Sequence, residues 1–196
     1  MAKIKSTNKA TKKEVIAIKA ASLFKAKGFN ATSMRELADL VGVEASSLYN
    51  HIGSKSELLH SICFKIANEF TVHLAQVENS NGNSVKKLQD IISFHIRIML
   101  KKFDEVFVAN HEWKHLQEPY LSNFLNQRRS YEKRLIAIVS EGIKNKEIIN
   151  GEPPIIIFTI LSAVRGLELW HRSKKNISEQ NLEEGMITQL TTGFIK

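Results

Sequence analysis

The chain has 196 residues, a length that allows one or two domains, and 43% of them are hydrophobic while 24% are charged. This composition is ordinary for a globular protein and is enough to bury a core. The formal net charge of +8 favours a polyanionic partner, either nucleic acid or an anionic membrane surface. The single cysteine, Cys63, excludes an intrachain disulfide and fits a reducing cytoplasm.

The N-terminus does not read as a signal peptide, because its apolar stretch is periodic and is interrupted by Lys19. We also expect no membrane span, since Arg165 and Glu168 interrupt the most apolar run of the chain.

Helical periodicity runs through the whole chain, so we expect an all-α protein of about nine helices. Residues 1–11 read as a basic flexible arm. Ser33 and Ser54 each stand three residues before a glutamate, which is the spacing of a capping box at a helix start. Gly28 and Gly42 stand where helices end. We expect helices at about 12–27, 33–41, 45–51, 54–78, 85–101, 103–118, 121–146, 154–173 and 178–194.

Residues 33–51 have the organisation of a helix-turn-helix. Ala38 is small where two helices must cross closely, Gly42 suits a tight turn, and Leu48 can pack the second helix onto the first. The second helix is short, and its outward side chains are small or polar, as a reader of the major groove requires.

These features predict a DNA interface with two kinds of contact. We expect bases to be read by Ser46, Ser47 and Asn50. We expect phosphates to be contacted by Thr32, Tyr49, His51 and Lys55, and we place Ser33 and Ala45 in the same interface. Residues 1–60 hold ten Lys or Arg and five Asp or Glu, so they supply +5 of the +8. A solvated basic surface on an ordinary helical bundle is the alternative that charge alone leaves open.

The stretch FKAKGFNATSMRELADLVGVEASSLYNHIGSKSELL resembles the N-terminal domain of the TetR family of bacterial transcriptional regulators, over about residues 12–62. The family pattern G-F/Y-x-x-T-S/T-M-x-x-I/L-A-x-x-A/V-G-V runs from Gly28 to Val43. The pattern L-Y-x-H/Y-F-x-S-K-x-x-L follows, with Ile52 in place of the usual Phe. Glu44 and Ala45 stand where the family often has Ser-Lys, so a Ser N-cap and a common phosphate-contacting lysine are absent.

The resemblance implies a helix-turn-helix DNA-binding domain at 12–54 and a ligand-binding and dimerisation domain at 55–196. It further implies a cytoplasmic homodimeric repressor that binds a palindromic operator and is released by a small-molecule inducer. The apolar run from Ile155 through Phe158 to Leu167 is too hydrophobic on several sides for a helix with one exposed face, which supports a dimer.

The C-terminal half resembles a TetR branch with an E-W-x-x-L helix and a downstream R-x-x-Y/F helix. That branch is associated with lipid and acyl-CoA catabolism, which implies an acyl-CoA or a fatty-acid-like inducer. A cavity for it could be lined by Phe94, Ile98, Phe103, Phe107, Trp113, Phe124, Tyr131 and Phe158. Arg128, Arg129 and Arg165 could meet an anionic head group. Plain aromatic core is the alternative, and Glu168 could pair with Arg165.

Residues 111–115 read HEWKH, the H-E-x-x-H pattern of zinc peptidases. The longer form of that pattern fails, because Glu118 and Leu121 occupy its Gly and last His positions. A downstream carboxylate ligand such as Glu132 or Glu141 stays open. We therefore predict a protein that is not an enzyme, with no catalytic residues, no metal and no cofactor. A zinc-dependent hydrolase that uses His111, Glu112 and His115 is the alternative.

Overall fold

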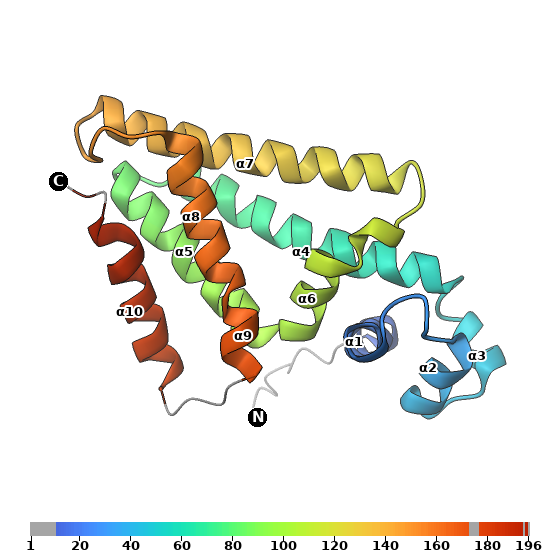
Figure 1. The fold of residues 1–196 in the computed structure, drawn as a ribbon. Coiled ribbons are helices and arrows are strands. Elements are labelled where there is room, and N and C mark those ends of the chain that lie inside the picture. Colours follow the sequence, from blue (N-terminus) through green and yellow to red (C-terminus); the bar gives the residue numbers. More distant parts are fainter. Residues whose placement is uncertain (1–10, 173–176, 194, 196) are drawn as a thin grey trace, which may run out of the picture.

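The computed structural model describes residues 11–172, 177–193 and 195. Over these residues the chain forms ten α-helices and one short 3-10 helix, and the one β contact is an isolated bridge between Ile148 and Ile195. The expected all-α class is confirmed (Figure 1). The helices are α1 (Lys12–Lys27), α2 (Met34–Val41), α3 (Ala45–Tyr49), α4 (Lys55–Glu78), α5 (Ser84–Lys101), α6 (Phe103–His111), η1 (Trp113–His115), α7 (Tyr120–Lys144), α8 (Pro153–Arg165), α9 (Leu167–Arg172) and α10 (Glu179–Thr192).

Helices α1 to α3 form a small head at one end of the molecule, and α8 to α10 lie at the opposite end (Figure 1). Ser33 caps α2 as a full capping box, because its side chain accepts from the Glu36 amide while Glu36 accepts from the Ser33 amide. Gly42 follows with φ 79°, a left-handed conformation that glycine adopts without steric cost. Ala38 and Leu48 are buried where α2 meets α3, so the head has the expected helix-turn-helix form.

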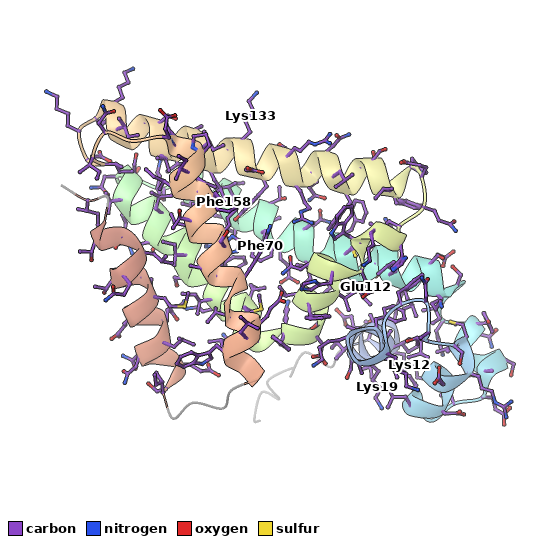
Figure 2. All side chains as sticks on the ribbon, in the orientation of Figure 1. Lys12, Lys19, Phe70, Glu112, Lys133 and Phe158 are labelled. Atoms are coloured by element: carbon purple, nitrogen blue, oxygen red, sulfur yellow. The ribbon has the colours of Figure 1, made fainter. Side chains whose placement is uncertain are left out.

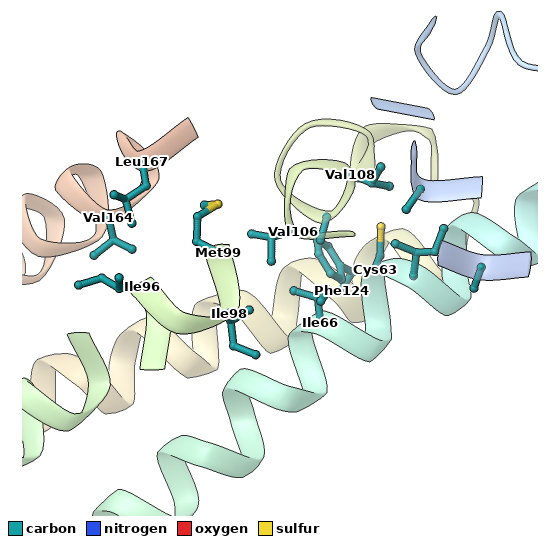
Figure 3. Close-up of a cluster of buried hydrophobic side chains, with 14 of the residues drawn as sticks. Cys63, Ile66, Ile96, Ile98, Met99, Val106, Val108, Phe124, Val164 and Leu167 are labelled. Atoms are coloured by element: carbon teal, nitrogen blue, oxygen red, sulfur yellow. The ribbon is translucent and has the colours of Figure 1, made fainter. Parts of the chain in front are cut away.

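The C-terminal helices surround a continuous apolar core. Figure 3 shows this cluster running from Val164 and Leu167 on α8 and α9, past Met99 and Val106, to Phe124 on α7. Cys63 lies in the same cluster, and burial raises the pKa of its thiol to about 12. The thiol is therefore a small apolar core group and not a reactive nucleophile.

Two expected helices are interrupted, and those expected at 45–51, 121–146 and 178–194 end two residues early, at Tyr49, Lys144 and Thr192. The helix expected at 103–118 stops at His111 and continues only as the 3-10 turn Trp113–His115, because Glu112 is held by a partner distant in sequence, as described below. The helix expected at 154–173 is divided into α8 and α9 at Gly166. Glycine disfavours a helix interior, and the Gly166 amide closes α8 by donating to the Ser162 carbonyl.

Candidate nucleic-acid interface and ligand cavity

The outward face of α3 carries the residues that were expected to read bases. Ala45, Ser46 and Asn50 are exposed, and Ser47 is half-buried. On the opposite side Leu48 is fully buried against the head. A single buried leucine thus anchors a five-residue helix whose free surface is small and polar, and such a surface can enter a major groove without steric obstruction.

Tyr49 and His51 flank this surface. Tyr49 is 52% exposed, and His51 is also exposed. Both side chains end in hydrogen-bonding groups beside the α3 face, which is compatible with the expected contacts to phosphates.

Thr32 and Lys55, which were expected to contact phosphates, use their side-chain donors inside the head. The Thr32 hydroxyl donates to the Gly28 carbonyl at 2.9 Å. The Lys55 ammonium donates to the carbonyls of Phe29 (2.9 Å), Asn30 (3.3 Å) and Thr32 (2.7 Å), and it lies 4.6 Å from the centre of the Phe29 ring. Lys55 therefore fixes the loop that connects α1 to α2. Ser33 is the N-cap of α2, and its side chain is exposed on the head.

Sequence reasoning gave no role to Arg35, an exposed cation in the first turn of α2. Lys12 and Lys13 are also exposed, at the start of α1 (Lys12 in Figure 2). Lys19 is different, because its ammonium donates to the Leu40 carbonyl at 2.7 Å and joins α1 to α2. The exposed cations of the head supply the positive surface that a DNA backbone requires.

A second site is a cavity of about 140 Å³ enclosed by α4, α5, α6, α7 and α8. Its apolar wall consists of Ile66, Ala67, Phe70, Met99, Val106, Ala109, Phe124, Leu161 and Val164. Its polar groups are Thr71, His95, Asn110, Gln127, Arg128, Tyr131, Glu132 and Arg165. An apolar enclosure with a few convergent polar groups is the usual form of a small-molecule site.

Four of the residues expected to line a cavity do so, namely Phe124, Arg128, Tyr131 and Arg165. The other seven lie elsewhere, and of these Arg129 is exposed on α7. Phe94 stacks on His73 with ring centres 3.9 Å apart, and Ile98 is buried in the core. Phe103 and Phe107 contact each other on α6. Trp113 lies beneath the Arg128 guanidinium, and Phe158 is exposed. Sequence reasoning missed His95, Asn110 and Gln127, because nothing local marks a polar residue as facing a cavity.

The cavity is electropositive at one end. Burial lowers the pKa of Arg128, and the positive charge of Arg165 lowers it further. The Arg128 guanidinium is supported by the rings of Trp113 and Phe124, at 5.7 and 5.8 Å, which are cation–π contacts. The carboxylate of Glu132, which also lines the cavity, acts in the opposite direction and raises the pKa of Arg128. Two cations that face one apolar space form a site that an anionic group would stabilise.

His95 and Tyr131 form a neutral pair on the same wall. The His95 Nε2 atom lies 2.8 Å from the Tyr131 hydroxyl. Burial lowers the pKa of His95 to about 3, with His73 and Arg165 adding to the effect, and burial raises the pKa of Tyr131. Both groups are therefore uncharged at neutral pH, and both can take part in hydrogen bonds to a ligand.

The HEWKH stretch does not assemble the site of a zinc peptidase. His111 lies at the end of α6 with its Nε2 atom 2.7 Å from Glu168. Glu112 accepts a hydrogen bond from the Phe29 amide at 3.0 Å. His115, in η1, stacks on the Phe29 ring with centres 5.5 Å apart. Within the part of the chain that the structure describes, no group of three His, Cys, Asp or Glu side chains is placed to hold a metal ion, so nothing here supports the hydrolase alternative.

Helices α8 and α9 present an exposed apolar stripe. Ile155 is 62% exposed, and Phe158 and Leu169 are each 71% exposed; Figure 2 labels Phe158 on α8. The segment Pro153–Trp170 has 18 residues and a mean hydropathy of 1.3, so it is long and apolar enough to cross a membrane by length and composition only, a test that the core helix of a soluble protein also passes. The segment is nevertheless divided at Gly166, and its buried side packs into the same core as α5 and α7.

Two family models match the chain. Residues 18–62 match the model described as "Bacterial regulatory proteins, tetR family". Residues 81–194 match the model described as "Tetracyclin repressor-like, C-terminal domain".

Individual proteins are similar at a lower level. The HTH-type transcriptional repressor KstR2 of Mycobacterium tuberculosis is 23% identical over 126 residues, which are 64% of this chain and 63% of that protein. The chain thus matches less than two thirds of that relative's length. The corresponding repressor of Rhodococcus jostii is 24% identical over 127 residues, 64% of this chain and 62% of that protein.

Solved structures share the fold. The structure of the ketosteroid transcriptional regulator KstR2 of Mycobacterium tuberculosis superposes with a TM-score of 0.88 at 19% identity, covering 97% of each chain. The structure of AibR in complex with isovaleryl coenzyme A and operator DNA superposes with a TM-score of 0.80 at 23% identity, covering 91% of this chain and 97% of that one.

Proposed function

The chain belongs to the tetR family of bacterial regulatory proteins, and on that premise we propose that it is a homodimeric transcriptional repressor released from its operator by a small molecule. The observation that carries the proposal is the α3 surface, where Ser46, Ser47 and Asn50 face outward while Leu48 fixes the helix from behind. We infer that the protein acts in the cytoplasm, where its operator lies, and that it has no enzymatic activity of its own.

In this proposal, different side chains of the head contact the bases and the phosphates of the DNA. Asn50 has an amide that can pair with the edge of one base, whereas the Tyr49 hydroxyl can donate to a phosphate of any sequence. Thr32 and Lys55 act indirectly in this proposal, because they hold the loop before α2 and do not extend to the duplex.

Replacing Asn50 by Ala is therefore expected to relax the preference for one base pair, with a loss of about tenfold in discrimination at that position. Replacing Tyr49 by Phe, which removes only the hydroxyl, is expected to weaken binding to all duplexes by a similar factor. Binding curves on a selected duplex and on its single-base variants measure both effects. If Asn50→Ala weakened binding to all duplexes equally, the Asn50 side chain would contact the DNA backbone, and its assignment to a base would be contradicted.

The inducer that the cavity supports best is a compact acyl group joined to an anionic part. The enclosed volume of about 140 Å³ is close to that of a cavity that holds benzene, roughly 150 Å³. A steroid nucleus would require a larger space, since cavities for drug-sized ligands span about 300–1,000 Å³, and a whole coenzyme A would as well. In this proposal only the acyl group enters the cavity, and the coenzyme extends from its open side. AibR was solved with isovaleryl coenzyme A, which has the proposed combination of a small branched acyl group and anionic phosphates.

Arg128 is the residue on which this ligand proposal depends. Replacing Arg128 by Met keeps an unbranched apolar stem and removes the guanidinium, so binding of isovaleryl coenzyme A is expected to weaken by about tenfold to a hundredfold. The thermal midpoint without ligand should not fall, because the substitution removes a buried cation whose desolvation lowers its pKa. Arg129→Met is the matched control, since Arg129 is exposed on the next position of α7.

Calorimetry with wild type and both variants decides this point. Equal affinities of wild type and Arg128→Met for the ligand would show that the Arg128 guanidinium does not contribute to ligand binding. Tighter binding of a steroid thioester than of short acyl thioesters would contradict the proposed size of the inducer.

The proposed dimer uses the exposed stripe of α8 and α9. Ile155, Phe158 and Leu169 recur on one side of these helices, and a two-fold axis would let the same stripe cover itself. A dimer also presents two α3 helices to a palindromic operator. We prefer this assignment to a membrane contact, because the segment is interrupted at Gly166 and carries Arg165 and Glu168.

A further inference from the structure

Glu44 stands at the start of α3, and its side chain takes no part in building that helix. It is the N-cap residue, yet its carboxylate makes no capping hydrogen bond, and the side chain is exposed. Only the backbone of Glu44 supports the helix, because its carbonyl accepts from the Leu48 amide at 3.0 Å. We propose that the Glu44 carboxylate reads a cytosine in each half of the operator. This inference rests on the proposed repressor function and specifies one base pair of the operator.

The glutamates at the other helix starts of the head have a structural use. Glu14 and Glu36 accept from the N-cap amides of α1 and α2 at 2.7 and 2.8 Å, and Glu57 accepts from the Gly53 amide at 3.0 Å. The usual N-cap residues are Ser, Thr, Asp and Asn, whose short side chains bond to the first free amides of the helix. Glu44 forgoes this stabilisation, and departures from local rules are expected at functional sites.

The negative charge of Glu44 is also unusual for its position. The chain carries a net charge of +8, and Figure 1 shows α3 at the outer edge of the head. A carboxylate on a surface that approaches DNA is repelled by the phosphates. It is stabilised in the complex when it accepts a hydrogen bond from the DNA, and in the major groove the donors are the amino groups of cytosine and adenine.

Cytosine is the base whose groove edge suits a carboxylate best. It presents the N4 amino donor without an acceptor beside it, whereas adenine presents the N7 acceptor next to its N6 amino group. Guanine presents two acceptors, and thymine presents an acceptor and a methyl group. The first residues of a recognition helix contact base edges. Because Asn50 lies at the opposite end of α3, Glu44 and Asn50 would read different base pairs.

Two affinities of the full-length protein test this role of Glu44. One is for the duplex that wild type selects from a random library, and the other is for a duplex of unrelated sequence. Glu44→Ala should weaken binding to the selected duplex by about tenfold, because a bond to a base is lost. The same variant should tighten binding to the unrelated duplex by about twofold, because a repulsion of phosphates is removed.

The opposite signs of these two changes separate base reading from simpler roles. A carboxylate that only repelled DNA would tighten both affinities when removed, and one that only stabilised α3 would weaken both. Asp39→Ala is the matched control, since Asp39 is an exposed carboxylate on α2. It should change both affinities by the same factor and keep every base preference.

Library selection with wild type and Glu44→Ala completes the test. Wild type should enrich a C·G pair at one position of each half-site, and Glu44→Ala should lose that preference alone. Glu44→Gln, which keeps an uncharged acceptor, should retain part of it. Unchanged preferences in Glu44→Ala, or an equal loss at every position, overturn the assignment of Glu44 to cytosine while an enriched palindrome leaves the repressor proposal intact. If wild type enriched no sequence, both proposals would be refuted.

Discussion

Replacing Phe158 by Asp is expected to leave the chain monomeric at micromolar concentration and to weaken operator binding by at least about a hundredfold. Phe158 is 71% exposed on α8, and in a two-fold interface the substitution would place two carboxylates near each other in an apolar contact. A monomer would then present one α3 helix instead of two, and would lose the second set of groove contacts.

Val72→Asp is the matched control for that experiment. Val72 is an apolar residue that is 58% exposed on α4, away from the α8–α9 stripe, so its replacement should change neither mass nor affinity. Sedimentation equilibrium and duplex binding on the same samples give both readouts. If the Phe158→Asp protein remained dimeric, the dimer interface would have to lie on another surface.

Acidification is expected to produce the largest loss of stability. The pKa of His95 is lowered to about 3 by burial, so the unfolded chain takes up a proton near pH 6.5 that the folded chain does not accept. Stability is therefore complete above about pH 6.5 and falls as the pH approaches 3, by about 1.4 kcal/mol per pH unit from this group alone. Burial also lowers the pKa of His73 and of His60, which adds a contribution of the same sign.

The His95 contribution is isolated by His95→Gln, which has no titrating group but can still bond to Tyr131. Urea unfolding at pH 7, 6, 5 and 4 should give a smaller slope of the unfolding free energy against pH in this variant than in wild type. Parallel slopes in wild type and His95→Gln would show that His95 takes up its proton at the same pH in the folded and the unfolded chain, and would contradict the lowered pKa.

Much of the helical organisation could be predicted from local signals. The bounds expected for α1 and for the end of α4 agree with the structure, and the Ser33 capping box and the Gly42 turn lie where the sequence placed them. These features depend on contacts within one turn of helix, which the sequence displays directly.

The cavity wall could not be predicted in the same way, because it depends on the rotation of each helix relative to its neighbours. Phe94 and His95 are adjacent on α5, yet only His95 faces the cavity while Phe94 stacks on His73. One residue corresponds to a rotation of about 100°. The roles of Lys55 and Glu112 were hidden for a related reason, since their partners lie 23 to 26 and 83 residues away in the chain.

Selection of duplexes from a random DNA library by the full-length protein tests the central claim most directly. The proposed repressor is expected to enrich a palindrome whose half-sites are about 10 base pairs apart, or a multiple of that spacing, because each α3 helix of the dimer enters one major groove. Asn50→Ala should enrich the same palindrome with one relaxed base pair in each half. Recovery of all sequences in equal proportion, with affinity set only by salt, would contradict sequence-specific binding and would identify the head as a general polyanion-binding surface.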